Sequence, residues 1–255
     1  TGTGGAITRE DIEQAASAPA AAPTTKASVP ITPTSPVDRN LRMRQAIAAA
    51  MSRANREIPH YYLSTTIDLQ PALDWLALQN EARTVTERLL YGVLLLKATA
   101  LALREVPELN AFWQDNQPAL QNSIHLGVAV SLRGGGLIAP AIHDADRKSL
   151  DELMRDLRDL VARGRTGGLR SSELADPEQG VEVGYGIIYP PQVALVGFGK
   201  VVQRPWYLGE QIVPRSLITA TLAGDHRATD GHRGGVRCGS IIDRRPFCEP
   251  QARSF

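Results

Sequence analysis

The stretch "AGDHRATDGHRGG", residues 223–235, sets His226 between an aspartate and an arginine at the end of an apolar run, "LITATLAG". The apolar and β-branched residues before the histidine predict a strand. Strand ends that enter loops are where rigid scaffolds present reactive side chains. His226 can therefore be a catalytic base, one of a metal-binding pair, or a solvated turn residue.

The metal reading is the weakest of the three. His226 and Asp230 are four residues apart and would share one face of a helix, but two ligands are too few for a typical transition-metal site and no other His or Cys cluster lies nearby in sequence. The solvated turn is the ordinary state of a charged strand end. These residues alone leave the base and the turn as open alternatives.

Composition describes a globular chain with an unremarkable overall charge. Its 255 residues are 43% apolar, which allows one large domain or two small ones with a sizeable core. The 28 basic and 27 acidic residues leave a formal net charge of +1. No global electrostatic attraction therefore favours nucleic acid or an anionic membrane as a partner.

The cysteines and the hydropathy pattern predict a cytoplasmic protein. Cys238 and Cys248 match neither a CxxC metal pair nor a disulfide framework. The first residues, "TGTGGAITRE", lack the features of a signal peptide, and no apolar run approaches the roughly 18 to 20 residues of a membrane-spanning helix.

Helical and strand patterns interleave along the chain. Thr8 and Asp11 mark a helix start within residues 1–17, and residues 18–37 form a linker rich in Ala, Pro and Thr. Further on, apolar spacing predicts helices over 38–57, 71–82, 86–107 and from Ser149 onward, and strands over 60–70, 124–132, 136–142, 192–201 and 215–226. The predicted fold is α/β, with a mixed sheet covered by helices.

The segment "DHRATDG" also resembles the H-x-x-x-D-G signature of the dihydrolipoamide acyltransferases, which share a fold with chloramphenicol acetyltransferase. Other segments resemble the same family in the same order: "MRQAIAAAMSRANREIPHYYLSTTIDL", "PELNAFW", "LGVAV", "GLIAPAIHDADRKSL" and "GIIYPPQVALVGFGKV". The resemblance covers most of residues 40–235. Residues 1–17 resemble the second half of the family's peripheral subunit-binding module.

The resemblance implies acyl transfer between coenzyme A and the dihydrolipoyl group of a carrier domain, with acetyl as the first expected acyl group. His226 would be the general base that takes the thiol proton, a role that typically contributes about 10² to 10⁴ in rate. Asp230 would orient the loop through an ion pair with Arg44, and Gly231 would allow the chain to turn. His60 and His143 are expected to be structural histidines, and no motif supports His125 or His232.

The family also implies an assembly. Its members form trimers with the active site at the subunit interface, the base coming from one chain and the oxyanion donor from its neighbour, and trimers build larger cores. We expect as partners further copies of this chain, a lipoyl domain and other dehydrogenase-complex subunits. The 255 residues hold no lipoyl-lysine segment, so we expect the carrier upstream or on another protein.

Two departures from the family leave a second hypothesis open. The strand that supplies the family's oxyanion hydroxyl, roughly T-[IV]-[ST]-N-L-G, has no counterpart, and neither Ser171 nor Ser172 matches it. The oxyanion donor is therefore unassigned. Residues 236–255, broken by Pro246 and Pro250, do not resemble the family's final helix.

The sequence thus predicts a catalytic domain over 38–235, followed by an atypical tail. The alternative is an assembly scaffold of the same family with little or no transfer activity. A free-standing acetyltransferase for a small hydroxyl compound is a third hypothesis, and the linker with its partial binding module argues against it.

Overall fold

The computed structural model describes residues 36–131, 137–166 and 180–231. The chain divides into two units between Arg39 and Asn40, and all the described residues except 36–39 belong to the second. The predictions for residues 1–17, for the linker up to residue 35, for Ser171, Ser172 and His232, and for the tail over 236–255 lie outside the described residues.

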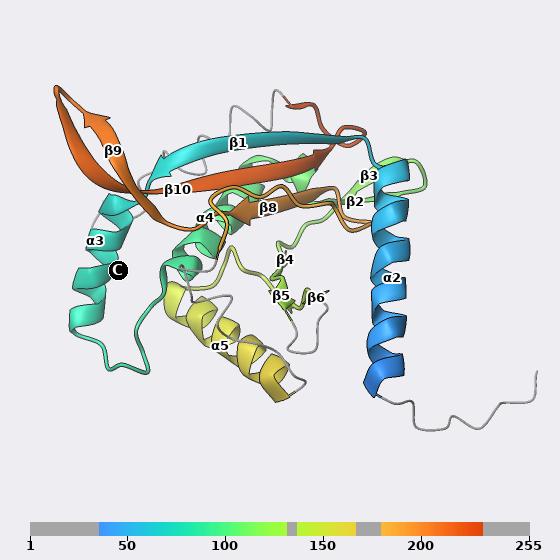
Figure 1. Cartoon of the computed structure of the whole chain (residues 1–255), viewed down its shortest axis with the longest axis horizontal. Coiled ribbons are helices and arrows are strands. Elements are labelled where there is room, and N and C mark those ends of the chain that lie inside the picture. The colour runs from blue at the N-terminus through green and yellow to red at the C-terminus, as the bar shows by residue number, and fades with distance from the viewer. Residues whose placement is uncertain (1–35, 132–136, 167–179, 232–255) are drawn as a thin grey trace, which may run out of the picture. The chain divides into compact units, whose positions relative to one another are not determined.

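A long central strand, β10 (Gln211–Asp225), organises the main sheet. It pairs along its C-terminal half with β1 (His60–Asp68) on one side and with β8 (Ala194–Phe198) on the other, and its N-terminal half forms a hairpin with β9 (Val202–Leu208). Figure 1 shows this hairpin extending beyond the rest of the sheet. The register sets His60 opposite Asp225, so the start of β1 lies beside the loop that carries His226.

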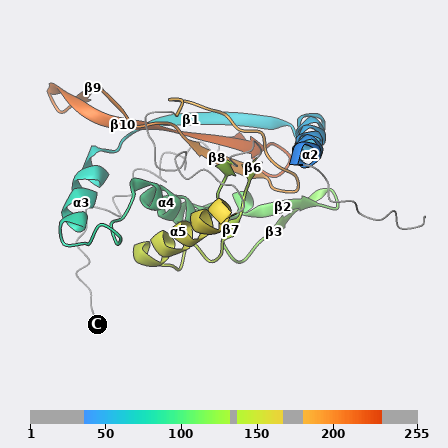
Figure 2. The same ribbon diagram turned by 60° about the horizontal axis from the view of Figure 1, so that its bottom comes forward.

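Helices cover one face of this sheet, as the sequence predicts. α3 (Gln70–Glu81), α4 (Tyr91–Glu105) and α5 (Leu150–Thr166) lie below β1 and β10 in Figures 1 and 2. The main core joins side chains of these helices to the sheet, including Leu94 of α4, Leu153 of α5 and Ile218 of β10, all at most 1% exposed. Burial of these side chains, at roughly 25 cal/mol per Å² of apolar surface, is the main force that holds the layers together.

The remaining long helix, α2 (Pro36–Glu57), contributes to a second, smaller core through its last turns. Ala54 and Ile58 pack with Ile188 and with Ala223 of β10. The predicted helix over 38–57 is confirmed.

Three short antiparallel pairs complete the described structure. β2 (Ala111–Gln114) pairs with β3 (Gln117–Leu120), β4 (Leu126–Gly127) with β7 (Ala141–Ile142), and β5 (Val130–Ser131) with β6 (Leu137–Ile138). The last two confirm strands within the ranges predicted over 124–132 and 136–142. The pairing of β2 with β3 and the strand β9 were not predicted.

The α/β class is confirmed, but the expected mixed sheet is not what the described residues form. Every strand pairing within them is antiparallel. The prediction was wrong on this point because alternation of helices and strands suggests parallel crossovers, whereas the three strands beside one another here, β1, β10 and β8, run in alternate directions.

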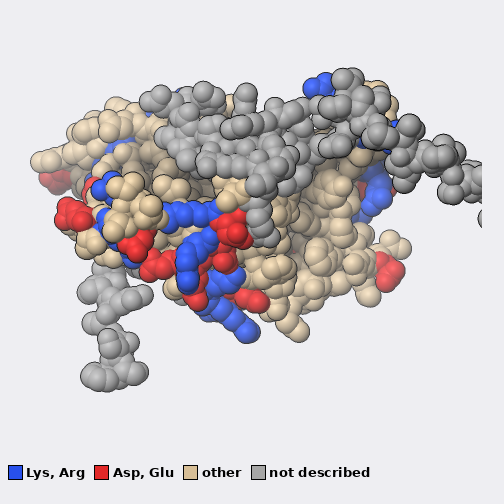
Figure 3. All heavy atoms as spheres, turned by 90° about the horizontal axis from the view of Figure 1, so that it is seen from below, with Lys and Arg blue, Asp and Glu red and all other residues tan. Residues whose placement is uncertain are grey.

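The surface that carries α5 shows acidic and basic side chains interspersed (Figure 3). The ion pairs around α4 and α5 include Arg83 with Asp151 and Arg104 with Asp146. Mixed charge of this kind keeps a surface solvated without creating a field of one sign. Within the described part of the chain, no helix combines the length and apolar character that crossing a bilayer requires.

Candidate active site

His226 follows the last residue of β10, and its side chain is exposed in the single chain. Its backbone N–H donates a 3.0 Å hydrogen bond to the carbonyl of Pro59, the residue before β1. The preceding N–H, that of Asp225, donates to the carbonyl of Val193 at 2.8 Å. The candidate base is therefore attached through its backbone to the adjoining strand regions, as the strand-end argument predicts.

The two neighbours of His226 form an ion pair whose carboxylate is buried. Asp225 is 0% exposed, and its carboxylate accepts bonds from Arg227 Nε at 3.0 and 3.2 Å and from Nη2 at 2.7 Å. The Arg227 guanidinium carbon lies 4.5 Å from the centroid of the Trp113 ring of β2, a cation–π contact. The solvated turn, one of the alternatives that the sequence left open, therefore does not describe Asp225.

An aromatic ring borders His226 on another side. The rings of Tyr61 and His226 meet edge to face, with centroids 5.5 Å apart. Tyr61 lies opposite Gly224 in the sheet, and a Cβ placed on Gly224 would lie 2.2 to 2.5 Å from three atoms of the tyrosine side chain. Gly224 therefore gives the Tyr61 ring the space to pack beside the candidate base. Sequence reasoning did not identify this pair.

Asp230 and Gly231 remain close to this cluster. The Asp230 side chain is exposed, and its backbone carbonyl accepts a 3.3 Å bond from the Thr229 hydroxyl. A Cβ on Gly231 would lie 3.7 Å from the Tyr61 ring, an ordinary contact, so space alone does not require glycine there. Arg44 is exposed on α2, and its pairing with Asp230 stays a prediction.

His60 has the structural role expected of it. Its Nδ1 donates to the carbonyl of Ile58 at 2.9 Å, and its Nε2 accepts from the N–H of Ile188 at 3.0 Å. These two bonds occupy both ring nitrogens of a neutral imidazole. His60 is therefore not available as a second base in this arrangement.

His143 is exposed after β7, and its ring meets that of His125 edge to face with centroids 4.7 Å apart. His125 Nδ1 accepts the backbone N–H of Asp144 at 3.0 Å. The two histidines thus contact each other and the turn that follows β7. Among the described residues, no group of three or more His, Cys, Asp and Glu side chains is arranged to hold a metal ion.

The segment before β8 crosses the sheet without forming a strand. Its residues 180–192 include no serine or threonine. The carbonyl of Gly184 accepts a 2.8 Å bond from the Thr221 hydroxyl of β10, and the carbonyl of Val181 accepts from the N–H of Lys200 at 2.9 Å. The described residues 180–192 therefore supply no serine or threonine hydroxyl in place of the one that the family's strand provides.

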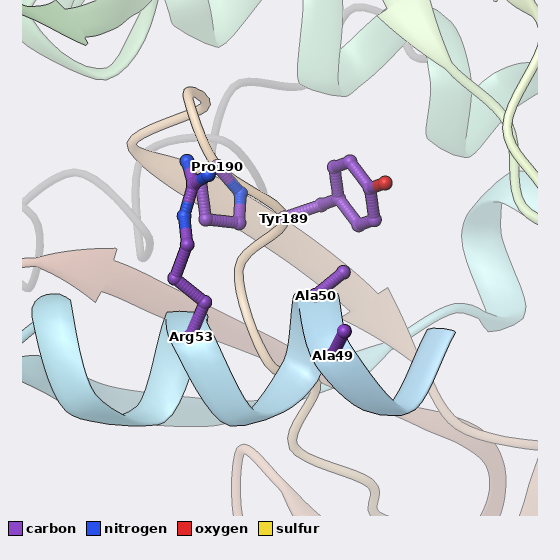
Figure 4. A pocket seen from close by; sticks show the side chains of 5 residues that line it. All are labelled: Ala49, Ala50, Arg53, Tyr189 and Pro190. Atoms are coloured by element: carbon purple, nitrogen blue, oxygen red, sulfur yellow. The ribbon is translucent and has the colours of Figure 1, made fainter. Parts of the chain in front are cut away.

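A hollow of about 280 Å³ lies between α2 and the turn before β8 (Figure 4). It is lined by Ala49, Ala50, Arg53, Tyr189 and Pro190. None of the predicted site residues lines it. It is therefore separate from the His226 cluster.

The comparisons with known proteins agree with the motif. The family described as 2-oxoacid dehydrogenases acyltransferase (catalytic domain) matches residues 37–241. The dihydrolipoyllysine-residue acetyltransferase component of the pyruvate dehydrogenase complex of Zymomonas mobilis is 31% identical over 249 residues, covering 91% of this chain and 56% of that protein. The corresponding component of Rhizobium meliloti is 30% identical over 205 residues, covering 75% of this chain and 46% of that protein. The chain thus spans about half the length of these relatives.

Solved structures show the same fold. The cubic core of a pyruvate dehydrogenase multienzyme complex superposes with a TM-score of 0.71 at 25% identity, covering 85% of this chain and 99% of that chain. A chloramphenicol acetyltransferase superposes with a TM-score of 0.50 at 13% identity, covering 79% of this chain and 94% of that one, and supports the fold alone. With most of its length matched by the family, this chain belongs to the 2-oxoacid dehydrogenase acyltransferases and contains their catalytic domain.

Proposed function

We propose that this domain transfers an acyl group, acetyl first, between coenzyme A and a dihydrolipoyl-lysine, with His226 as the general base. The observation that carries the proposal is the setting of His226. Its imidazole is exposed at the end of the central strand, while hydrogen bonds and the Tyr61 ring fix its surroundings. A base held in this way can meet a substrate that arrives from outside the chain.

In the proposed reaction, the attacking thiol gives its proton to the His226 ring as its sulfur forms a bond to the thioester carbonyl carbon. The tetrahedral intermediate then collapses and the original carbon–sulfur bond breaks. His226 returns the proton to the departing sulfur. A thiol attacks efficiently only as it loses its proton, because the thiolate is the nucleophilic form.

The exposure of His226 in one chain supports a further part of the proposal, a trimer with the site between subunits. A base on the surface of the single chain becomes enclosed only when another chain covers it, and exclusion of water strengthens electrostatic interactions in the site. The matching cubic core is an assembly of such domains. Asp230 would hold the loop after His226 through Arg44, and a lipoyl domain and other subunits of a dehydrogenase complex would be the partners.

One observation favours the second candidate, a scaffold of the same family with little or no activity. The described segment 180–192 contains no serine or threonine in place of the family's oxyanion hydroxyl, and loss of one such donor can cost about 10² to 10³ in rate.

The test follows acetyl transfer from acetyl-coenzyme A to free dihydrolipoamide, with succinyl and branched-chain donors as a panel, and determines the mass of the assembly by sedimentation. Transfer faster than that of His226→Ala supports the enzyme. Trimers or larger particles with a wild-type rate equal to that of His226→Ala would support the scaffold and contradict the enzyme.

A further inference from the structure

We propose that Asp225, Arg227 and Trp113 form a clamp that positions His226, so that Arg227 is a positioning residue for acyl transfer rather than a surface charge. The inference rests on the proposed function and deepens it. It also makes a structural claim about the orientation of the His226 ring that can be measured without any turnover.

The two charged members of the clamp are the residues on either side of His226. Arg227 Nε and Nη2 donate hydrogen bonds of 2.7 to 3.2 Å to the Asp225 carboxylate. The Arg227 backbone N–H also donates to Asp225 Oδ1 at 3.0 Å. The buried Asp225 carboxylate thus accepts hydrogen bonds from both the side chain and the backbone N–H of Arg227. These bonds fix the turn in which His226 lies.

The backbone on both sides is equally constrained. The Asp225 carbonyl accepts from the N–H groups of Ala228 at 3.0 Å and Thr229 at 3.1 Å, while the His226 N–H donates to Pro59. Because the Asp225 carboxylate anchors this turn, a change in its partner should shift the backbone of His226 and with it the direction of the ring.

Burial makes the pair costly unless its geometry is good. A carboxylate with no exposed surface loses its hydration, and only close, charge-assisted hydrogen bonds compensate for this. Arg227 remains 28% exposed, and the Trp113 ring covers the guanidinium at 4.5 Å. Trp113 is itself bound to the segment before β8, because its backbone N–H donates a 2.7 Å hydrogen bond to the Pro191 carbonyl.

The same contacts occupy Arg227 and leave it poorly placed to bind the phosphates of coenzyme A. Its Nε and Nη2 both donate to Asp225, and its guanidinium carbon lies over the Trp113 ring. A planar fork that binds a carboxylate at two points and also makes a cation–π contact with an aromatic ring is a use of arginine that lysine cannot reproduce.

The experiment compares Arg227→Lys with a matched control, Arg215→Lys. Arg215 pairs with Asp68 at 2.6 and 2.8 Å, both side chains are 19% exposed, and the pair lies nearer the other end of β10. Each substitution keeps the positive charge and removes one guanidinium group, which binds its carboxylate through two nitrogens. Arg227→Lys should lower kcat about 10-fold or more with KM for both substrates nearly unchanged, because misplacement of about 1 Å at a reacting group can cost up to about 100-fold. Arg215→Lys should leave kcat as in the wild type.

The structural readout is the pair of ¹⁵N signals of the His226 ring in histidine-labelled protein, assigned with His226→Ala. They should shift in Arg227→Lys and stay in place in Arg215→Lys. If Arg227→Lys does not fold, Trp113→Phe serves instead, with a smaller change in the same direction because Phe offers a weaker cation–π face.

The two proposals fail in different ways. Equal kcat in the wild type and in Arg227→Lys, with unshifted ring signals, would overturn the clamp and leave the function intact. Equal losses of kcat in Arg227→Lys and Arg215→Lys would mean that Arg227 acts only through the general stability of the domain, and this result would also overturn the clamp. A wild-type protein without transfer activity would overturn the function, and the ring signals alone would then decide for or against the clamp.

Discussion

Tyr61 and Gly224 face each other across β1 and β10, and the tyrosine ring occupies the space that a side chain on the glycine would need. The same ring meets the His226 imidazole edge to face. This pair therefore links the register of the central strands to the setting of the candidate base. A Cβ at residue 224 would displace the Tyr61 ring from its place over Gly224 and from its contact with the His226 imidazole.

Gly224→Ala should lower the free energy of unfolding by about 1 to 3 kcal/mol, the usual cost of overpacking a well-packed position. Urea denaturation measures it. Gly92→Ala is the matched control, since nothing lies within 4 Å of a Cβ at this helical position in α4. That variant should be as stable as the wild type or up to about 1 kcal/mol more stable. Equal stability of the two variants would contradict the close packing of Tyr61 against Gly224.

Glu152 should make the stability of the domain depend on acid pH. The backbone N–H and then the hydroxyl of Ser149 donate to its carboxylate and lower the pKa of Glu152. A carboxyl whose pKa is lowered by folding stabilises the protein above its unfolded pKa of about 4.3, and this contribution is lost as the pH falls through the folded pKa. Glu152→Gln should therefore lose less stability than the wild type on acidification below pH about 5.

Ser149→Ala should flatten the acid dependence in the same way, because it removes one of the two donors to Glu152 and the hydroxyl that caps the start of α5. Thermal unfolding across a pH series checks both variants. Acid slopes identical to that of the wild type in both would exclude the proposed coupling between cap and carboxylate.

Lys97 holds the turn before α5 against α4. Its ammonium donates to the carbonyls of Asp146 at 2.8 Å and Lys148 at 2.6 Å, and burial lowers its pKa. Lys97→Met keeps the aliphatic stem but leaves both carbonyls without this donor, so unfolding free energy should fall by about 1 to 3 kcal/mol. Arg104→Met, which breaks a pair whose arginine is 49% exposed, should cost less. The reverse order in a denaturation series would show that the turn does not depend on Lys97.

Asn80 closes the loop that joins α3 to α4. Its side-chain amide donates to the Leu89 carbonyl at 3.0 Å, and its oxygen accepts the Leu89 N–H at 2.8 Å. Asn80→Asp keeps the acceptor and loses the donor, while Asn80→Ala loses both. Hydrogen exchange at the Leu89 amide should therefore be accelerated in the alanine variant, and less in the aspartate variant. Exchange unchanged in both variants would mean that other contacts hold this loop.

Local sequence patterns predicted the helices and strands whose buried side chains recur at one regular spacing along the chain. The apolar stripe of α5 and its Ser149 cap are both in the structure, and the apolar run that becomes the C-terminal half of β10 was predicted as a strand from residue 215. The N-terminal half of β10 was missed because Pro214 lies within it, opposite Pro205 of β9. Proline in a strand argues against that assignment except near an edge, and this hairpin lies at an edge.

The site was predictable only where it follows a sequence motif. "DHRATDG" indicated His226 as the candidate base, but the arginine that pairs with the buried Asp225 is itself packed against Trp113, which comes from β2 more than a hundred residues earlier. The turn of that hairpin sets Asp115 and Asn116 at positive φ, 51° and 59°, which "DN" between two short strands could have indicated. The space for Tyr61 could not be inferred, because a glycine near a strand end gives no sign of what packs over it.

The most direct test compares acetyl transfer to dihydrolipoamide by the wild type with that by His226→Ala, in assemblies shown by sedimentation to have the same size. If His226 is the general base, the substitution lowers kcat by about 10² to 10⁴ with little change in KM. A His226→Ala protein that assembles normally and transfers acetyl groups at the wild-type rate would contradict the role assigned to His226.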